Sequence, residues 1–152
     1  MTSDRDDLRE FAQTVAPRDG HIDLTRAALL IAALEYPDLD VETEAAALDS
    51  MANVVGNRVD AADGPLGSVN TLSEYPFDEL GFEGNRSDFY DTRNSFLNEV
   101  LTHRVGIPIL LSLLYIEVGR RVGIPLAGVG LPYHFMVKHA EIDDLLVDPF
   151  NG

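Results

Sequence analysis

The stretch that decides the fold runs from residue 106 to residue 149 and reads GIPILLSLLYIEVGRRVGIPLAGVGLPYHFMVKHAEIDDLLVDP. Pro108 suits the first position of a helix, where its missing N–H would have no partner in any case. The apolar pattern predicts a helix over residues 109–122 that Gly123 ends. Because this helix is apolar over most of its circumference, we expect it to be buried. The side chains expected in the core are Leu110, Leu111, Leu114, Ile116 and Val118.

After Gly123 the hydrophobic period changes from that of a helix to that of strands. Residues 126–131, 135–138 and 145–147 read as short strands separated by turns. Upstream, the pattern predicts helices over 24–35, 41–60, 67–80 and 96–104, a short surface helix over 3–16, and a loop over 82–93. The expected N-caps of four of these helices are Ser3, Asp23, Asp40 and Ser95. Helices followed by a meander of strands indicate an α+β fold, with an N-terminal helical bundle packed on a core that holds a small antiparallel sheet.

Composition narrows the function classes. The 152 residues are 45% hydrophobic and 24% charged, within the range of globular proteins. The chain has 26 acidic and 11 basic residues, so its net charge is -15. Because this charge repels the phosphate backbone, nucleic acid is a poor partner. No apolar run is long enough for a membrane span or a signal sequence, so we expect a cytoplasmic protein that does not bind membranes. There is no cysteine, hence no thiol nucleophile or thiolate metal site.

Longer motifs carry a resemblance to a known family. They are NSFLNEVL (94–101), RVGIPI (104–109), LSLLY (111–115), GVGLPYHF (128–135) and DPFNG (148–152). Over about residues 23–152 the chain resembles the transglutaminase-like superfamily, whose architecture is papain-like. It is most similar to the cysteine-less Sir-B-type branch, bacterial proteins in which tetratricopeptide repeats usually follow this domain.

The resemblance implies a domain organisation. Residues 1–22 would be an N-terminal extension, and residues 23–152 one transglutaminase-like domain whose helical part ends near 85–94. Members of the family continue beyond the position of Gly152, so the resemblance implies a C-terminally truncated fragment or a short member.

The resemblance also implies a site. His134 matches the superfamily histidine and Asp148 the superfamily aspartate, while the nucleophile position falls on or beside Pro108, which carries no nucleophile. Ser112 lies one helical turn further along the same face and is the substitute nucleophile. A mid-helix serine more often bonds the carbonyl four residues earlier, here that of Pro108. Tyr133 replaces the small residue that usually precedes the histidine.

Two functions follow from this pattern. The first is a non-catalytic binding or regulatory module with a His/Asp cleft for a protein or peptide partner, or for a small-molecule ligand. The second is a hydrolase or acyltransferase that uses His134, Asp148 and either Ser112 or a water. The candidate binding residues are Asn94, Glu99, Pro108, Tyr115, Tyr133 and His134. The histidines show no metal-ligand spacing, and we expect neither a metal nor a cofactor.

Overall fold

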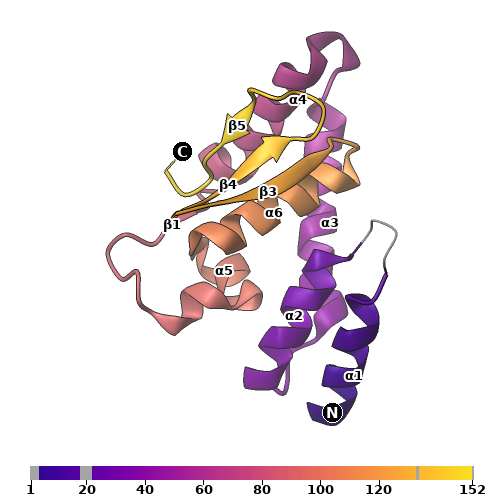
Figure 1. The fold of residues 1–152 in the computed structure, drawn as a ribbon, viewed down its shortest axis with the longest axis vertical. Helices are drawn as coiled ribbons and strands as arrows, with labels where there is room; N and C mark the ends of the chain where they lie inside the picture. The colour runs from indigo at the N-terminus through magenta and orange to yellow at the C-terminus, as the bar shows by residue number, and fades with distance from the viewer. Residues whose placement is uncertain (1–3, 18–21, 133, 152) are drawn as a thin grey trace.

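Helix α6 (Pro108–Arg121) is the central element of the fold (Figure 1). It contacts strands β3 (Leu126–Leu131) and β4 (His134–His139) on one side. On the other side it contacts helices α2 (Leu24–Glu35), α3 (Val41–Arg58) and α4 (Gly64–Ser73). Pro108 is its first residue, and Gly123 beyond its end has a φ of 81° that suits glycine. Both features are as the sequence predicts.

The computed structural model describes residues 4–17, 22–132 and 134–151. The other helices are α1 (Asp4–Thr14), α2 (Leu24–Glu35), α3 (Val41–Arg58), α4 (Gly64–Ser73), a π-helix (Glu74–Glu79) and α5 (Leu97–His103), with short 3-10 turns at Ala61–Asp63 and Thr92–Ser95. The remaining strands are β1 (Glu83–Gly84), β2 (Val105–Gly106) and β5 (Leu146–Val147). This arrangement is the expected α+β fold.

The main sheet is antiparallel, in the order β3-β4-β5. Leu131 pairs with His134 at the hairpin turn, and Leu126 pairs with His139 at the far end. Because β3 begins shortly after α6 ends, the hairpin runs back along the helix and its turn lies toward the helix N-terminus (Figure 1). A separate parallel pair, Glu83 with Val105 and Gly84 with Gly106, joins the segment before α5 to the segment before α6.

The core lies between α6, the sheet and helices α3 and α4. Leu111, Leu114 and Val118 are fully buried in it, as predicted. Leu110 and Ile116 are only partly buried, which corrects the expectation for these two. For Ile116 the reason is that its side chain lines a surface groove beside β3. The other fully buried apolar side chains of this cluster include Leu48, Val55, Leu72, Val100 and Val137.

Of the three predicted helix caps that lie among the described residues, two agree with the structure. The Asp23 carboxylate accepts from the backbone N–H of Arg26, and the Asp40 carboxylate accepts from two N–H groups of α3. The predicted cap Ser95 is wrong: it belongs to the 3-10 turn, and α5 begins after Phe96 with no side-chain cap. Ser3 lies outside the described residues.

The region after α3 also differs from the prediction. One helix was expected over 67–80, whereas α4 begins at Gly64 and gives way to the π-helix. Pro76 explains the change, because it has no N–H to continue the α-helical ladder and its ring crowds the preceding turn. The chain switches to longer bonds, such as Leu80 N–H to the Tyr75 carbonyl, before Gly81 (φ 79°) ends the helix.

Among the described residues, no helix combines the length and the apolar character that crossing a bilayer requires.

Candidate functional site

His134 and Asp148 form a hydrogen-bonded pair at one end of the sheet. His134 is the first residue of β4, and Asp148 follows β5, which pairs with β4. His134 Nε2 lies 2.8 Å from Asp148 Oδ2, and both side chains are about one-quarter exposed (25% and 22%). The adjacency expected from the order of the elements is therefore present.

Asp148 determines which nitrogen of the His134 imidazole carries the hydrogen. An ionised carboxylate only accepts hydrogen bonds, so His134 Nε2 must carry the hydrogen that points to Asp148. In the neutral ring Nδ1 is then an acceptor, able to receive an N–H or O–H from a bound molecule.

Each oxygen of the Asp148 carboxylate accepts two hydrogen bonds. Oδ1 accepts from the backbone N–H groups of Phe150 and Asn151, and Oδ2 accepts from His134 and from the Asn151 amide. Burial by itself raises the pKa of Asp148, but the hydrogen bonds from Asn151 and His134 outweigh it and lower the pKa below its usual value. Asp148 is therefore ionised at neutral pH.

This lowered pKa predicts a pH dependence of stability. A carboxyl whose pKa is lower in the folded state stabilises the fold above its unfolded pKa, about 3.9, and that contribution is lost as the pH falls through the folded value. We expect the midpoint temperature of unfolding of wild type to exceed that of Asp148→Asn at pH 6 and the two to converge below about pH 4. The measurement is calorimetry of both proteins across this range. A difference that does not change with pH would contradict the charge-based account.

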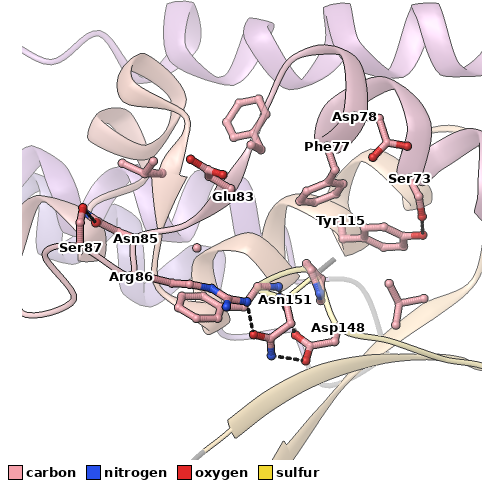
Figure 2. A pocket seen from close by; sticks show the side chains of 16 residues that line it. Ser73, Phe77, Asp78, Glu83, Asn85, Arg86, Ser87, Tyr115, Asp148 and Asn151 are labelled. Atoms are coloured by element: carbon pink, nitrogen blue, oxygen red, sulfur yellow. Dashed lines mark hydrogen bonds between the residues drawn. The ribbon is translucent and has the colours of Figure 1, made fainter.

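A cleft of about 560 Å3 opens beside Asp148 (Figure 2). One wall carries Phe77 and Tyr115, and the other is formed by the segment 83–87 that contains β1. The segment 147–151 closes the base, with Asp148 and Asn151 at the cleft surface. Its lining combines aromatic rings with carboxylates and amides, a mixture typical of ligand sites.

Phe150 joins two walls of this cleft. A Cβ at Gly84 would lie 2.3 Å from two Phe150 ring carbons, so the ring lies directly on the glycine backbone. The Arg86 guanidinium stands 5.7 Å from the centre of the same ring, and Phe89 packs edge-on against it. The segments 83–86 and 148–151, far apart in sequence, are thereby held together.

Gly84→Ala tests this junction. The added methyl group must displace Phe150, and overpacking of this kind costs about 1–3 kcal/mol. We expect denaturant unfolding to show that loss, and Gly84→Ala combined with Phe150→Ala to lose less than the sum of the two single changes. Strict additivity of the two changes would contradict the contact.

The N-terminus of α6 carries no nucleophile. Pro108 occupies its first position, and Ser112, one turn further on, is fully buried. Ser112 Oγ makes no hydrogen bond to any described residue, so it contacts neither His134 nor the carbonyl of Pro108. The expected back-bond to Pro108 is wrong, and the serine lacks the adjacent base that a nucleophile needs.

Tyr115 lines the cleft but is only 1% exposed. Its hydroxyl lies 2.6 Å from Ser73 Oγ and donates to the Val69 carbonyl at 3.1 Å. Burial raises the pKa of Tyr115 to about 12, so the hydroxyl stays protonated at neutral pH. Tyr115 therefore forms a fixed wall of the cleft and no titrating group.

Asn94 and Glu99 lie apart from the main cleft, in a small cavity of about 180 Å3. Asn94 is 2% exposed, and its amide donates to the carbonyls of Asp88 and Phe89 and accepts from Asn85. Glu99 pairs with His103 at 2.9 Å. Tyr133 lies outside the described residues.

Sequence reasoning missed Arg86 and Asn151 as residues of the cleft. Asn151 follows Asp148 by three residues, a spacing typical of a turn closed by an aspartate side chain, and this signal could have drawn attention to it. In the described part of the chain, no three His, Asp or Glu side chains gather in a way that could hold a metal ion.

Comparisons with known proteins agree with this architecture. A UPF0162 protein of Xylella fastidiosa is 43% identical over 136 residues, which are 88% of this chain and 48% of that protein. A UPF0162 protein of Pseudomonas aeruginosa is 34% identical over 134 residues, 85% of this chain and 47% of that protein. F-box only protein 21 of Mus musculus is 48% identical over 73 residues, 48% of this chain and 12% of that protein.

The chain spans about half the length of these two bacterial relatives. No solved structure matches it. The family model of the transglutaminase-like superfamily matches residues 42–152, which include α6, the sheet, His134 and Asp148. The chain therefore belongs to the transglutaminase-like superfamily.

Proposed function

We propose that this chain is a non-catalytic binding module of the transglutaminase-like superfamily and that its cleft receives a peptide segment of a partner protein. The observation that carries the proposal is the His134–Asp148 pair, whose carboxylate lines an open cleft. The resemblance puts the superfamily's nucleophile position on or beside Pro108, which carries no nucleophile. We further propose that the chain acts in the cytoplasm as the domain of a longer Sir-B-type protein with tetratricopeptide repeats.

The loss of a nucleophile supports binding over turnover. The resemblance to the superfamily implies acyl transfer by a thiolate at the N-terminus of the central helix, and none of the 152 residues is a cysteine. The alternative, a hydrolase or acyltransferase with Ser112, is disfavoured because Ser112 is buried and makes no hydrogen bond to His134. A water held by His134 Nδ1 is the remaining route to catalysis.

The chemistry of the cleft favours a neutral or basic peptide. Its lining contains the carboxylates of Asp78, Glu83 and Asp148 against the single guanidinium of Arg86. The rings of Phe77, Phe82 and Phe150 offer apolar contact. His134 is not among the lining residues; it adjoins the cleft through its hydrogen bond to the lining residue Asp148. Its Nδ1 accepts a hydrogen bond in the neutral ring, and a peptide supplies such donors as backbone N–H groups.

A displayed library of short linear peptides, selected on this chain, tests the proposal. We expect the selected peptides to be neutral or basic and to shift the NMR signals of His134 and Phe150 in a saturable titration. Phe77→Ala should weaken binding about tenfold, the effect of truncating an aromatic anchor. Glu83→Gln, a change at an exposed side chain that leaves the fold intact, should weaken the basic peptides selectively.

Ile31→Ala is the control, because Ile31 is an exposed apolar residue of α2. It should leave binding unchanged. Failure to select any peptide, or NMR shifts confined to α1 and α2, would overturn the peptide-binding proposal. Saturable binding of a small molecule that shifts the signals of His134 and Phe150 would overturn it in favour of a small-ligand site.

A further inference from the structure

The side chain of Asn151 lies between Arg86 and Asp148 (Figure 2). Arg86 Nη2 donates to Asn151 Oδ1 at 2.5 Å, and Asn151 Nδ2 donates to Asp148 Oδ2 at 2.6 Å. His134 Nε2 bonds the same carboxylate oxygen at 2.8 Å. A continuous polar chain therefore runs from the 83–87 wall of the cleft to the imidazole.

Both neighbours require the same orientation of the amide. A guanidinium only donates, so it must meet the amide oxygen, and a carboxylate only accepts, so it must meet the amide nitrogen. Rotation of the Asn151 amide by 180° would break both bonds at once. Arg86 is in turn held by its stacking on Phe150, which rests on Gly84.

The second donor determines where Oδ2 can lie. The backbone N–H groups of Phe150 and Asn151 hold Oδ1, which leaves the carboxylate free to rotate about that anchor. The Asn151 amide removes this freedom by holding Oδ2 at the point where His134 Nε2 meets it. Hydrogen bonds to an ionised group are the strong ones, so one such bond suffices to bias the orientation.

We propose that Asn151 is a positioning residue for the His134–Asp148 pair and that Arg86 holds Asn151 in this role. The inference concerns the cleft of the proposed function, but it rests on the pair alone and on no ligand. A failure of peptide binding would refute the binding module and leave this inference standing.

The test is the exchange of the His134 Nε2 proton with water, measured by NMR at low temperature on the 152-residue chain. Asn151→Asp keeps the shape of the side chain and an acceptor for Arg86, but it replaces the donor to Asp148 with an oxygen. We expect exchange to accelerate about tenfold or more, the change that loss of one hydrogen bond to a charged group produces. A residue that merely tied Arg86 to the C-terminal turn would show no acceleration.

Asn151→Ala is the second variant, because it removes the same donor without adding a charge and keeps the backbone N–H that bonds Asp148. It should give the same direction of change, and Arg86→Met a smaller one. Asn57→Asp, the same substitution on the exposed face of α3, is the control and should leave exchange unaltered.

An exchange rate within twofold of wild type in both Asn151 variants would overturn the proposal. The proposal would also be overturned if the Nε2 proton of wild type exchanged too fast to be observed at low temperature, because the hydrogen bond between His134 and Asp148 would then not be stably formed.

Discussion

Leu114→Ala is expected to lower the free energy of unfolding by about 2–5 kcal/mol, the cost of deleting a large buried aliphatic side chain. Leu114 is fully buried on α6, where the sheet meets helices α3 and α4. The alanine leaves a cavity that the surrounding elements cannot close without shifting α6 itself. Denaturant unfolding of the two proteins, followed by circular dichroism, measures the difference.

Leu66→Ala is the matched control for this change. Leu66 is 57% exposed, and its truncation should alter stability by less than about 0.5 kcal/mol. A loss below about 1 kcal/mol for Leu114→Ala would show that α6 is peripheral.

Glu117→Ala should also be strongly destabilising, by about 3 kcal/mol, because it removes a buried, multiply bonded carboxylate. Glu117 is 1% exposed on α6. Its carboxylate accepts from the backbone N–H of Leu24 and the hydroxyl of Thr25 at the start of α2, and it pairs with Arg120 and Arg121. Without it, the fully buried Thr25 hydroxyl loses its partner and α2 loses its tie to α6.

Equilibrium unfolding at neutral pH measures this effect, with Glu141→Gln at an exposed position as the control. Glu117→Gln should lose less than Glu117→Ala, since the amide oxygen can still accept from α2. Equal stability of wild type and Glu117→Ala would mean that this carboxylate contributes nothing to the docking of α2.

The elements that the sequence predicted well are those with strong local signals. α2 has an aspartate cap and an apolar run, and α6 has a proline at its start and a glycine beyond its end. Such signals depend on neighbours within a turn or two, so the sequence alone contains most of the information that they need. The three main strands were predicted for the same reason, from their alternation and their turn residues.

The features that the sequence did not predict depend on distant partners. β1 and β2 are two residues each and pair across more than twenty positions, too short to leave a periodic pattern. Burying the Glu117 carboxylate would be costly without partners, and that cost is offset by a hydrogen bond from α2 and by ion pairs with two arginines. Ser95 has the residue type of a cap, but the 3-10 turn takes it out of position.

The candidate site was predictable in part. Family resemblance pointed to His134 and Asp148, and antiparallel pairing of β4 with β5 explains why they meet. Arg86 and Asn151 are separated by 65 positions, and nothing in the local sequence links them. Their contact exists because Phe150 packs on Gly84 and brings the two segments together.

The most direct test of the central claim, a His/Asp cleft that binds without turnover, is an activity assay of wild type against His134→Ala. The assay combines amine incorporation into a glutamine-donor peptide with a panel of ester and amide substrates, in protein shown to be free of contaminating enzyme. We predict no turnover that differs between the two proteins, because remnants of a triad without its nucleophile catalyse orders of magnitude more weakly than the complete set. Turnover that His134→Ala abolishes would contradict the account, and a parallel loss in Ser112→Ala would identify the serine as the nucleophile.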